Sequence, residues 1–259
     1  MSLSSIVCIK SVVRAAPDGV GRRTPENSEL NPFDRPALEA ALRIKETRGG
    51  SVTALSMGPA VSIEALAEAQ AMGVDGAVLI NDPALAGSDT LATARVLAAA
   101  IGRMPPYTFV FFGTRSSDSD TGQVGPQTAT LLGLPFVSGV KQMQPKADDW
   151  EITRLMDDWE ELWRVRPPAA VTIHSTAFVP RTIPLAGIAN AYGHPEVQTW
   201  RLSDLGLSAD RVGLAGSPTR VASLAKVNRK RACRLLEGEP PQQVEALVAW
   251  LGAKGVMGS

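Results

Sequence analysis

Residues 107–133 read YTFVFFGTRSSDSDTGQVGPQTATLLG, and this stretch decides the fold. Its first six residues, 107–112, are apolar and rich in β-formers, which predicts a buried strand. Its last part carries Leu131 and Leu132 and ends at Gly133, which predicts a helix that stops at that glycine. The stretch is therefore predicted to run from a strand through a loop of small and acidic residues into a helix.

The loop between this strand and this helix is a candidate anion site. Asp120 or Thr121 is placed to cap the helix, and the backbone N–H groups that follow are then unpaired. Glycines 122 and 125 leave room for a ligand close to the backbone. A helix N-terminus with free amides and small residues favours an anion, most often a phosphate. The alternative is an ordinary strand–loop–helix connection that binds nothing.

Strands and helices alternate through the first half of the chain. Apolar runs predict strands at 5–9, 52–55, 77–80 and 107–112. Helical periodicity predicts helices at 37–47, 63–71 and 88–101. This alternation is typical of an α/β fold with a parallel-rich sheet flanked by helices. Because ligands of such sheets bind outside the carboxyl ends of the strands, the candidate sites are the turns after Ile9, Leu55 and Phe112.

The pattern changes beyond residue 135. Short apolar runs at 136–140, 150–154 and 162–165 predict strands joined by polar links, which make a local antiparallel section. Residues 169–174 predict one more strand, apolar enough for a central position in the sheet. Residues 180–188 predict a proline-bounded loop or short helix that exposes apolar side chains.

The last part of the chain predicts a separate arm. We expect a nucleotide-binding α/β domain over 1–224 and a basic tether with a helix over 225–259. The basic residues of the tether are Lys226, Arg229, Lys230, Arg231 and Arg234. A helix is predicted at 242–254, with an apolar face made by Val244, Leu247, Val248 and Leu251. Such an apolar face docks either on its own domain or on a partner. The basic residues of the tether form a solvated surface or, as the weaker alternative, an RNA-binding patch.

Composition narrows the function. The 259 residues include 26 basic and 26 acidic side chains, so no overall field favours nucleic acid or an anionic membrane. No run is apolar enough to span a bilayer, and no signal peptide is recognisable at the start. Cys8 and Cys233 have no metal-type spacing, which indicates reduced thiols and a cytoplasmic protein. His174 and His194 are the only histidines, which argues against a histidine-based catalytic or metal site.

Several short motifs in one order make the chain resemble the beta subunit of electron-transfer flavoproteins. The loop DSDTGQVGP at 118–126 is the most specific of them. The others are CIK at 8–10, NPF at 31–33, ALRIKE at 41–46, SMGP at 56–59, AMGVD at 71–75, GSDTLATA at 87–94, DLG at 204–206 and GLAGSPT at 213–219. The resemblance covers nearly the whole chain and implies an adenine-nucleotide-hydrolase-like or Rossmann-like fold.

The resemblance also implies a function. Beta subunits of this family form a heterodimer with an alpha subunit, which holds FAD. The heterodimer carries electrons from flavoprotein dehydrogenases to a quinone oxidoreductase or another acceptor, without bond-making chemistry in the beta subunit. The beta subunit binds AMP or, in bifurcating members, a second FAD. A third reading is a stand-alone stress-type protein that binds ATP or AMP.

The resemblance assigns residues to two sites. In the nucleotide site, the adenine lies between Cys8 and Met57, and the phosphate lies on the loop. The loop residues of that site are Asp118, Asp120, Thr121, Gly122, Gln123, Val124 and Gly125. In the partner-recognition segment, Leu185 and Ile188 contact the dehydrogenase. AMP is favoured over a second FAD because the chain shows no evident ring of polar or aromatic residues for another isoalloxazine, and has only two tyrosines.

Overall fold

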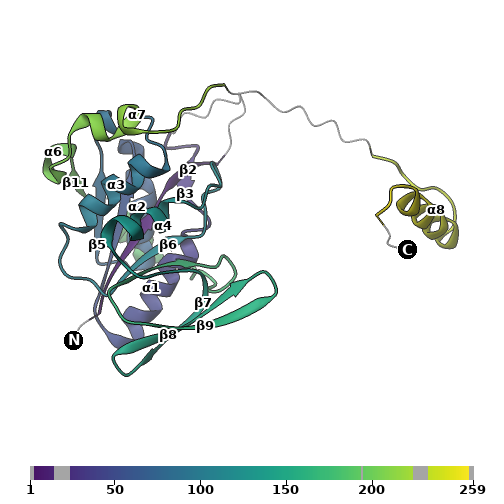
Figure 1. Cartoon of the computed structure of the whole chain (residues 1–259), viewed down its shortest axis with the longest axis horizontal. Coiled ribbons are helices and arrows are strands. Elements are labelled where there is room, and N and C mark those ends of the chain that lie inside the picture. Colours follow the sequence, from purple (N-terminus) through teal and green to yellow (C-terminus); the bar gives the residue numbers. More distant parts are fainter. Residues whose placement is uncertain (1–2, 15–23, 194, 224–232, 257–259) are drawn as a thin grey trace. The chain divides into compact units, whose positions relative to one another are not determined.

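The computed structural model describes residues 3–14, 24–193, 195–223 and 233–256. The chain divides into two compact units, Met1–Val221 and Ala222–Ser259. The first unit contains the sheet, and the described part of the second contains one long helix (Figure 1).

The main sheet in the described part of the first unit has nine strands in the order β11-β5-β4-β1-β6-β10-β7-β8-β9. The strands that pair in parallel are β1 (Ser4–Ile9), β4 (Ser51–Met57), β5 (Gly76–Ile80), β6 (Phe109–Gly113), β10 (Ala169–Ile173) and β11 (Gln198–Trp200). β7 (Phe136–Lys146) pairs in parallel with β10 and antiparallel with β8 (Asp149–Met156), which pairs antiparallel with β9 (Trp159–Val165). The antiparallel section thus extends the parallel sheet.

Helices cover both faces of this sheet. The long ones are α1 (Arg35–Arg48), α2 (Ile63–Met72), α3 (Thr90–Ile101) and α4 (Val124–Leu132). The short ones are α5 (Leu185–Ala191), α6 (Leu202–Leu205) and α7 (Gly213–Gly216), with 3-10 turns at Ala60–Ser62, Pro83–Leu85 and Ala209–Arg211. The helices end where the sequence provides a stop, because Gly73 and Gly133 adopt left-handed conformations at the ends of α2 and α4.

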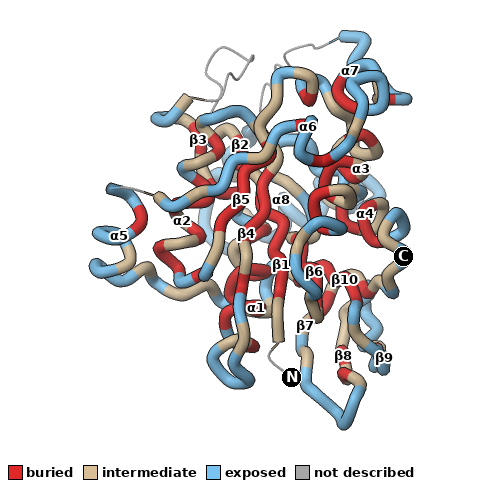
Figure 2. The backbone as a smooth tube through the Cα atoms, turned by 90° about the vertical axis from the view of Figure 1, so that its left-hand side faces the viewer, coloured by how far each residue is buried: buried red, intermediate tan, exposed pale blue. Residues whose placement is uncertain are grey.

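The core consists of two apolar layers, one on each face of the sheet. Alternate residues of β1 face opposite sides, so Val7 packs in the layer of α1 and α2, and Ile6 in the layer of α3 and α4. Figure 2 shows the buried backbone of β1, β4, β5 and β6 in the middle of the unit. The central strands are buried on both faces, as parallel strands between helices must be.

The predicted fold class is confirmed, and so are the strands and helices that alternate through residue 113. Several details differ. The strand predicted at 107–112 begins at Phe109 and reaches Gly113. β11 and a two-stranded sheet of β2 (Ser11–Val13) and β3 (Ser28–Leu30) were not predicted from the sequence. These are three-residue strands, too short to show a periodicity.

The second unit contains the predicted C-terminal helix, here α8 (Pro240–Ala253). A capping box of Glu239 and Gln242 starts it. Its apolar side chains are exposed within this unit, namely Val244, Leu247, Val248 and Trp250. Of the tether's basic residues, Arg234 is described and exposed, and Lys226, Arg229, Lys230 and Arg231 lie outside the described residues. The boundary expected at 224 and the docking of this unit on a partner stay predictions.

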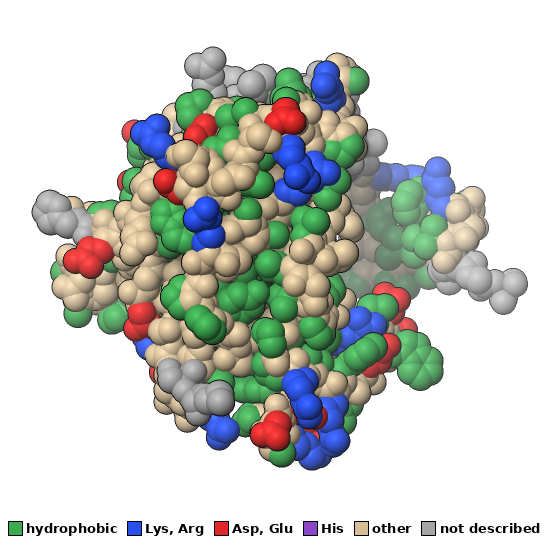
Figure 3. Space-filling view, turned by 60° about the vertical axis from the view of Figure 1, so that its left-hand side comes forward, with side chains coloured by type: hydrophobic (Ala, Val, Ile, Leu, Met, Phe, Trp, Pro, Cys, Tyr) green, Lys and Arg blue, Asp and Glu red, His purple; other side chains and the backbone are tan. Residues whose placement is uncertain are grey.

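The surface agrees with the balanced charge of the chain. On the face shown in Figure 3, acidic and basic side chains are interspersed with apolar ones. No helix in the described part of the chain has the length and apolar character that crossing a membrane requires.

Candidate functional site

The turns that follow β1, β4 and β6 lie side by side. β1 pairs with β4 on one side and with β6 on the other, so these three strands are adjacent in the sheet. Their registers place Cys8 opposite Leu55 and Phe112. Because all three strands run in the same direction, their carboxyl ends meet at one edge. The candidate site is built at this edge.

The two residues expected beside an adenine occupy this edge on the α3 side of the sheet. Cys8 is 6% exposed, and burial, followed by the nearby Asp34 carboxylate, raises the pKa of its thiol. Cys8 is therefore a neutral, apolar group. Met57 is half-buried and packs against the same layer as Cys8. The structure thus brings these two side chains to one layer, and their contact with an adenine stays a prediction.

The loop after β6 is tied to the end of β1 by a lysine. The Lys10 ammonium donates to Asp118 Oδ1 at 2.6 Å, to Ser119 Oγ at 3.2 Å and to Ser116 Oγ at 3.3 Å. Burial is the largest single influence and works against ionisation of Asp118, but the hydrogen bond and charge of Lys10, together with hydrogen bonds from Ser116 and Ser119, outweigh it and lower the pKa of this carboxyl. Asp118 is therefore a negatively charged anchor of the loop. Lys10 was not among the site residues predicted from the sequence.

The far half of the loop contains two left-handed residues. Asp120 has a φ of 54° and donates its N–H to Ser116 O at 2.9 Å. The Arg115 guanidinium lies 3.2 Å from Asp120 Oδ1 and 4.5 Å from the centre of the Phe33 ring. Gly122 has a φ of 63°, a conformation that favours glycine. These two residues turn the chain before the helix begins.

The capping expected from Asp120 or Thr121 is wrong. The structure begins α4 at Val124, with Gln123 as the flanking residue and no capping bond from the Gln123 side chain. The left-handed conformations of Asp120 and Gly122 delay the helix start beyond the reach of Asp120 and Thr121. The first-turn amides of α4 remain without a side-chain cap from Gln123, which suits an external anion.

The start of α4 packs tightly on the sheet beneath it. Gly125 is buried, and a Cβ atom there would lie 3.2 Å from Thr172 Cγ2 and 3.3 Å from Phe112 Cγ. A hollow of about 390 Å³ adjoins this helix start and continues over the ends of β10 and β7. Its lining residues are Thr114, Gly122, Gln123, Pro126, Phe136, Ser138, Gly139 and Thr172. The loop therefore borders an open space on the β10 side.

The partner-recognition residues predicted from sequence lie on α5. Leu185 is 85% exposed and Ile188 is 42% exposed, so both present apolar surface to solvent. The helix is held closely against α2, because a Cβ atom on Gly187 would lie only 2.3 Å from Ala71 O. The position of the exposed pair therefore depends on the packing of α5 on α2.

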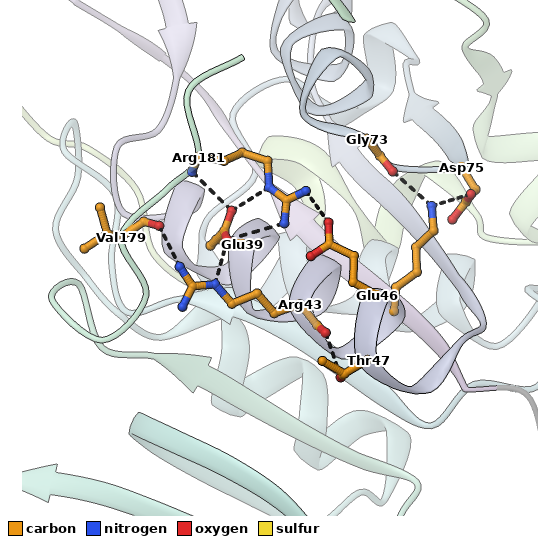
Figure 4. A network of polar contacts seen from close by, with 9 residues as sticks. Glu39, Arg43, Glu46, Thr47, Gly73, Asp75, Val179 and Arg181 are labelled. Atoms are coloured by element: carbon orange, nitrogen blue, oxygen red, sulfur yellow. Dashed lines mark hydrogen bonds and ion pairs between the residues drawn. The ribbon is translucent and has the colours of Figure 1, made fainter. Parts of the chain in front are cut away.

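The segment that leads into α5 is fixed by a buried carboxylate. Figure 4 shows Glu39 of α1 between two arginines. Glu39 accepts from Arg181 Nε at 2.8 Å, from the Arg181 backbone N–H at 3.1 Å and from Arg43 Nε at 2.7 Å. Arg43 also donates to Val179 O at 3.3 Å, and Arg181 pairs with Glu46. Residues 179–181 are thus pinned to α1.

No metal-type cluster accompanies these sites. Within the described ranges, no three His, Cys, Asp or Glu side chains gather where they would hold a metal ion.

Comparisons with known proteins agree with the resemblance seen in the sequence. The family model described as the electron transfer flavoprotein domain matches residues 21–205. The chain is 40% identical over 230 residues to an electron transfer flavoprotein subunit beta of Thermoanaerobacterium thermosaccharolyticum, covering 89% of this chain and 88% of that protein. It is 39% identical over 225 residues to the subunit of the same name in Clostridium acetobutylicum, covering 85% and 86%.

A third relative has a more specific name. The chain is 35% identical over 264 residues to the acryloyl-CoA reductase electron transfer subunit gamma of Anaerotignum propionicum, covering 97% of this chain and 98% of that protein.

Proposed function

The chain belongs to the electron transfer flavoprotein family, and we propose that it is the AMP-binding beta subunit of a heterodimer. In this proposal the alpha subunit holds FAD. The heterodimer accepts electrons from a flavoprotein dehydrogenase and passes them to an acceptor such as a quinone oxidoreductase. Electron transfer is the activity common to the relatives that the comparisons name. A cytoplasmic location is part of the proposal and is suggested by the two free cysteines, Cys8 and Cys233.

One observation supports the nucleotide site above all others: the start of α4 follows a left-handed glycine and is not capped by the flanking side chain. Backbone amides of a helix N-terminus bind phosphate oxygens well, and the helix dipole adds to the attraction. A Cβ atom on Gly122 would lie 3.1 Å from Thr114 O, so a side chain there would crowd the loop beside these amides. The residues present therefore fit a nucleotide phosphate.

The proposed role of this chain is to bind and orient, without bond-making chemistry of its own. FAD, when bound to the heterodimer, supplies the redox chemistry. Lys10 and Asp118 hold the loop, the amides of Gln123 and Val124 face the phosphate, and Cys8 with Met57 lines the adenine side. Cys8 and Met57 supply soft, polarisable walls of the kind that pack well on an aromatic ring.

The partner surface is proposed at α5. Leu185 and Ile188 form an exposed apolar pair, and side chains of this kind anchor an interface when a partner pocket covers them. The network of Glu39 and Arg181 fixes the chain just before this helix. The name of the acryloyl-CoA reductase relative suggests that the dehydrogenase acts on a CoA thioester.

A second candidate ligand is favoured by one observation. The hollow over β10 and β7 continues from the loop on the side away from Cys8 and Met57. A nucleotide longer than AMP, such as a second FAD, would extend into this space beyond its first phosphate. AMP remains the proposal, since the aromatic lining of the hollow is limited to Phe136.

The experiment is to produce the chain together with its alpha partner and to extract the bound nucleotides for absorbance and chromatography. We expect one FAD and one AMP per heterodimer. Two FAD molecules per heterodimer would overturn the AMP assignment. A chain that purifies without a yellow partner and binds ATP would instead support the stand-alone nucleotide-binding protein.

A further inference from the structure

Asp34 is a buried carboxylate between the ends of two neighbouring strands. It precedes α1 and is 5% exposed. Its Oδ2 accepts the Lys10 backbone N–H at 2.8 Å, and its carboxylate also accepts the backbone N–H of Gly113. A Cβ atom on Gly113 would lie only 2.3 Å from Asp34 Oδ1, so only glycine allows this approach. Asp34 therefore joins the end of β1 to the end of β6.

Asn31 connects the same carboxylate to the nucleotide loop. Its side chain donates to Asp34 and also to Arg115 O, the latter at 2.8 Å. Its Oδ1 accepts the Ser117 N–H at 3.2 Å. The Asn31 backbone N–H donates to Lys10 O at 2.9 Å, and the Asn31 carbonyl accepts from Asp34 N at 2.9 Å. Asn31 thus holds the first part of the loop through one carbonyl and one N–H group.

We propose that Asp34 is a positioning residue for the nucleotide loop: through Gly113 and Asn31 it fixes residues 114–123 in the conformation that receives a nucleotide phosphate. This inference rests on the proposed nucleotide site. Asp34 is buried beneath the loop and acts on its backbone. The ionised Asp34 carboxylate has two oxygens that accept hydrogen bonds from the three donors around it. In the neutral acid one of these oxygens carries a hydrogen, which faces the same donors and makes that oxygen a poorer acceptor.

The charge of Asp34 changes near neutral pH. Burial raises its pKa from 3.8 to about 7, although the donors from Lys10, Asn31 and Gly113 oppose this rise. From β1 it is faced by the Cys8 thiol, whose pKa is raised by burial and by Asp34, and by Lys10. From the loop, Asp118 reaches this group through its ion pair with Lys10.

Asp34→Asn tests the inference, because asparagine has nearly the shape of the neutral acid and likewise carries one acceptor and one donor group. AMP is titrated into the full-length chain by calorimetry at several pH values. The phosphate of AMP titrates in the same way with either protein, so its effect cancels in the ratio of the two Kd values. We expect this ratio to be near one at about pH 5.5 and to reach about tenfold weaker binding by the variant at about pH 8.5.

The matched control is Asp82→Asn. Asp82 also accepts two backbone N–H groups at a strand end, from Ala84 at 2.9 Å and from Leu202 at 3.2 Å, and neither of these belongs to the loop. This control is expected to bind AMP like the unaltered chain at every pH. If Asp34→Asn does not fold, Asn31→Ala serves instead, and it is expected to abolish the gain in affinity at high pH because it removes the connection to the loop.

The outcomes separate this inference from the proposed function. A Kd ratio that stays constant with pH, or an equal effect of Asp82→Asn, would show that Asp34 is merely structural and would overturn the inference while AMP binding stands. If the unaltered chain binds neither AMP nor FAD, the proposed nucleotide site fails, and the inference fails with it. A ratio that rises with pH for FAD alone would retain the positioning role and change the ligand.

Discussion

Replacing Gly122 by valine separates the nucleotide site from the fold. Gly122 has a φ of 63°, and a Cβ atom there would lie 3.1 Å from Thr114 O. A non-glycine residue in the left-handed region costs roughly 1–2 kcal/mol. Gly133 at the other end of α4 provides the matched control, because it has a φ of 67° and nothing lies within 4 Å of its added Cβ atom. Gly133→Val therefore has the same backbone cost without a group near the ligand.

The two variants should differ in nucleotide affinity far more than in stability. Displacing the phosphate from two amides removes two charge-assisted hydrogen bonds, each of about 1.5–3 kcal/mol. The sum of about 3–6 kcal/mol corresponds to an AMP affinity lower by ~10²–10⁴-fold. Calorimetric titration with AMP measures the affinity, and urea unfolding measures the stability. Normal AMP affinity in Gly122→Val, or an equal loss in Gly133→Val, would refute the placement of the phosphate on this loop.

Three further predictions concern Asp34 and the partner surfaces. The pKa of Asp34 rises from 3.8 to about 7 on folding. The folded chain therefore binds more protons than the unfolded chain between about pH 4 and about pH 7. Over this range the free energy of unfolding should fall by up to about 4 kcal/mol as the pH rises. Asp34→Asn should remove that part of the slope in urea unfolding measured against pH. Gly187→Ala places a methyl group 2.3 Å from Ala71 O, and it should raise the KM for the reduced dehydrogenase while the AMP content stays unchanged. The control is Gly193→Ala, because the atom nearest to its added methyl group is 3.8 Å away, and this variant should leave the KM unaltered. Deleting residues 238–259 should weaken assembly with the alpha subunit. If the truncated chain still co-elutes fully with the alpha subunit, α8 docks on its own domain and not on the partner.

Much of the fold could be predicted because its determinants are local. The apolar runs of β1, β4, β5 and β6 are continuous, and the helices between them show the helical period. Leu185 and Ile188 were also predictable as exposed residues, since prolines 180 and 184 come just before them and indicate a loop or short helix at the surface. Local signals of this kind do not depend on how distant parts of the chain meet.

The start of α4 could not be predicted in the same way. The capping rule looks only at nearby residue types, and Asp120 and Thr121 satisfy it. The conformation of the loop is decided by contacts across the chain, such as Lys10 with Asp118, which are 108 residues apart, and Asn31 with Arg115, which are 84 apart. Asp34 was missed for the same reason: the sequence NPFD reads as a turn before a helix, and its burial requires the close approach of Gly113.

The pKa values of the two buried carboxylates of this region are shifted in opposite directions, and the type of donor around each explains the difference. Asp34 accepts from backbone and amide N–H groups, and these, even with the charge of Lys10, do not outweigh its desolvation, so its pKa rises. Glu39 is 3% exposed and also desolvated, but the guanidinium groups of Arg181 and Arg43 outweigh that cost and lower its pKa. A change of pH near neutrality therefore alters the charge beneath the nucleotide loop and leaves the charge beneath the partner segment unchanged. The residue that precedes α1 thus supports the proposed nucleotide loop with a charge that titrates, and Glu39 within α1 supports the proposed partner segment with a constant charge.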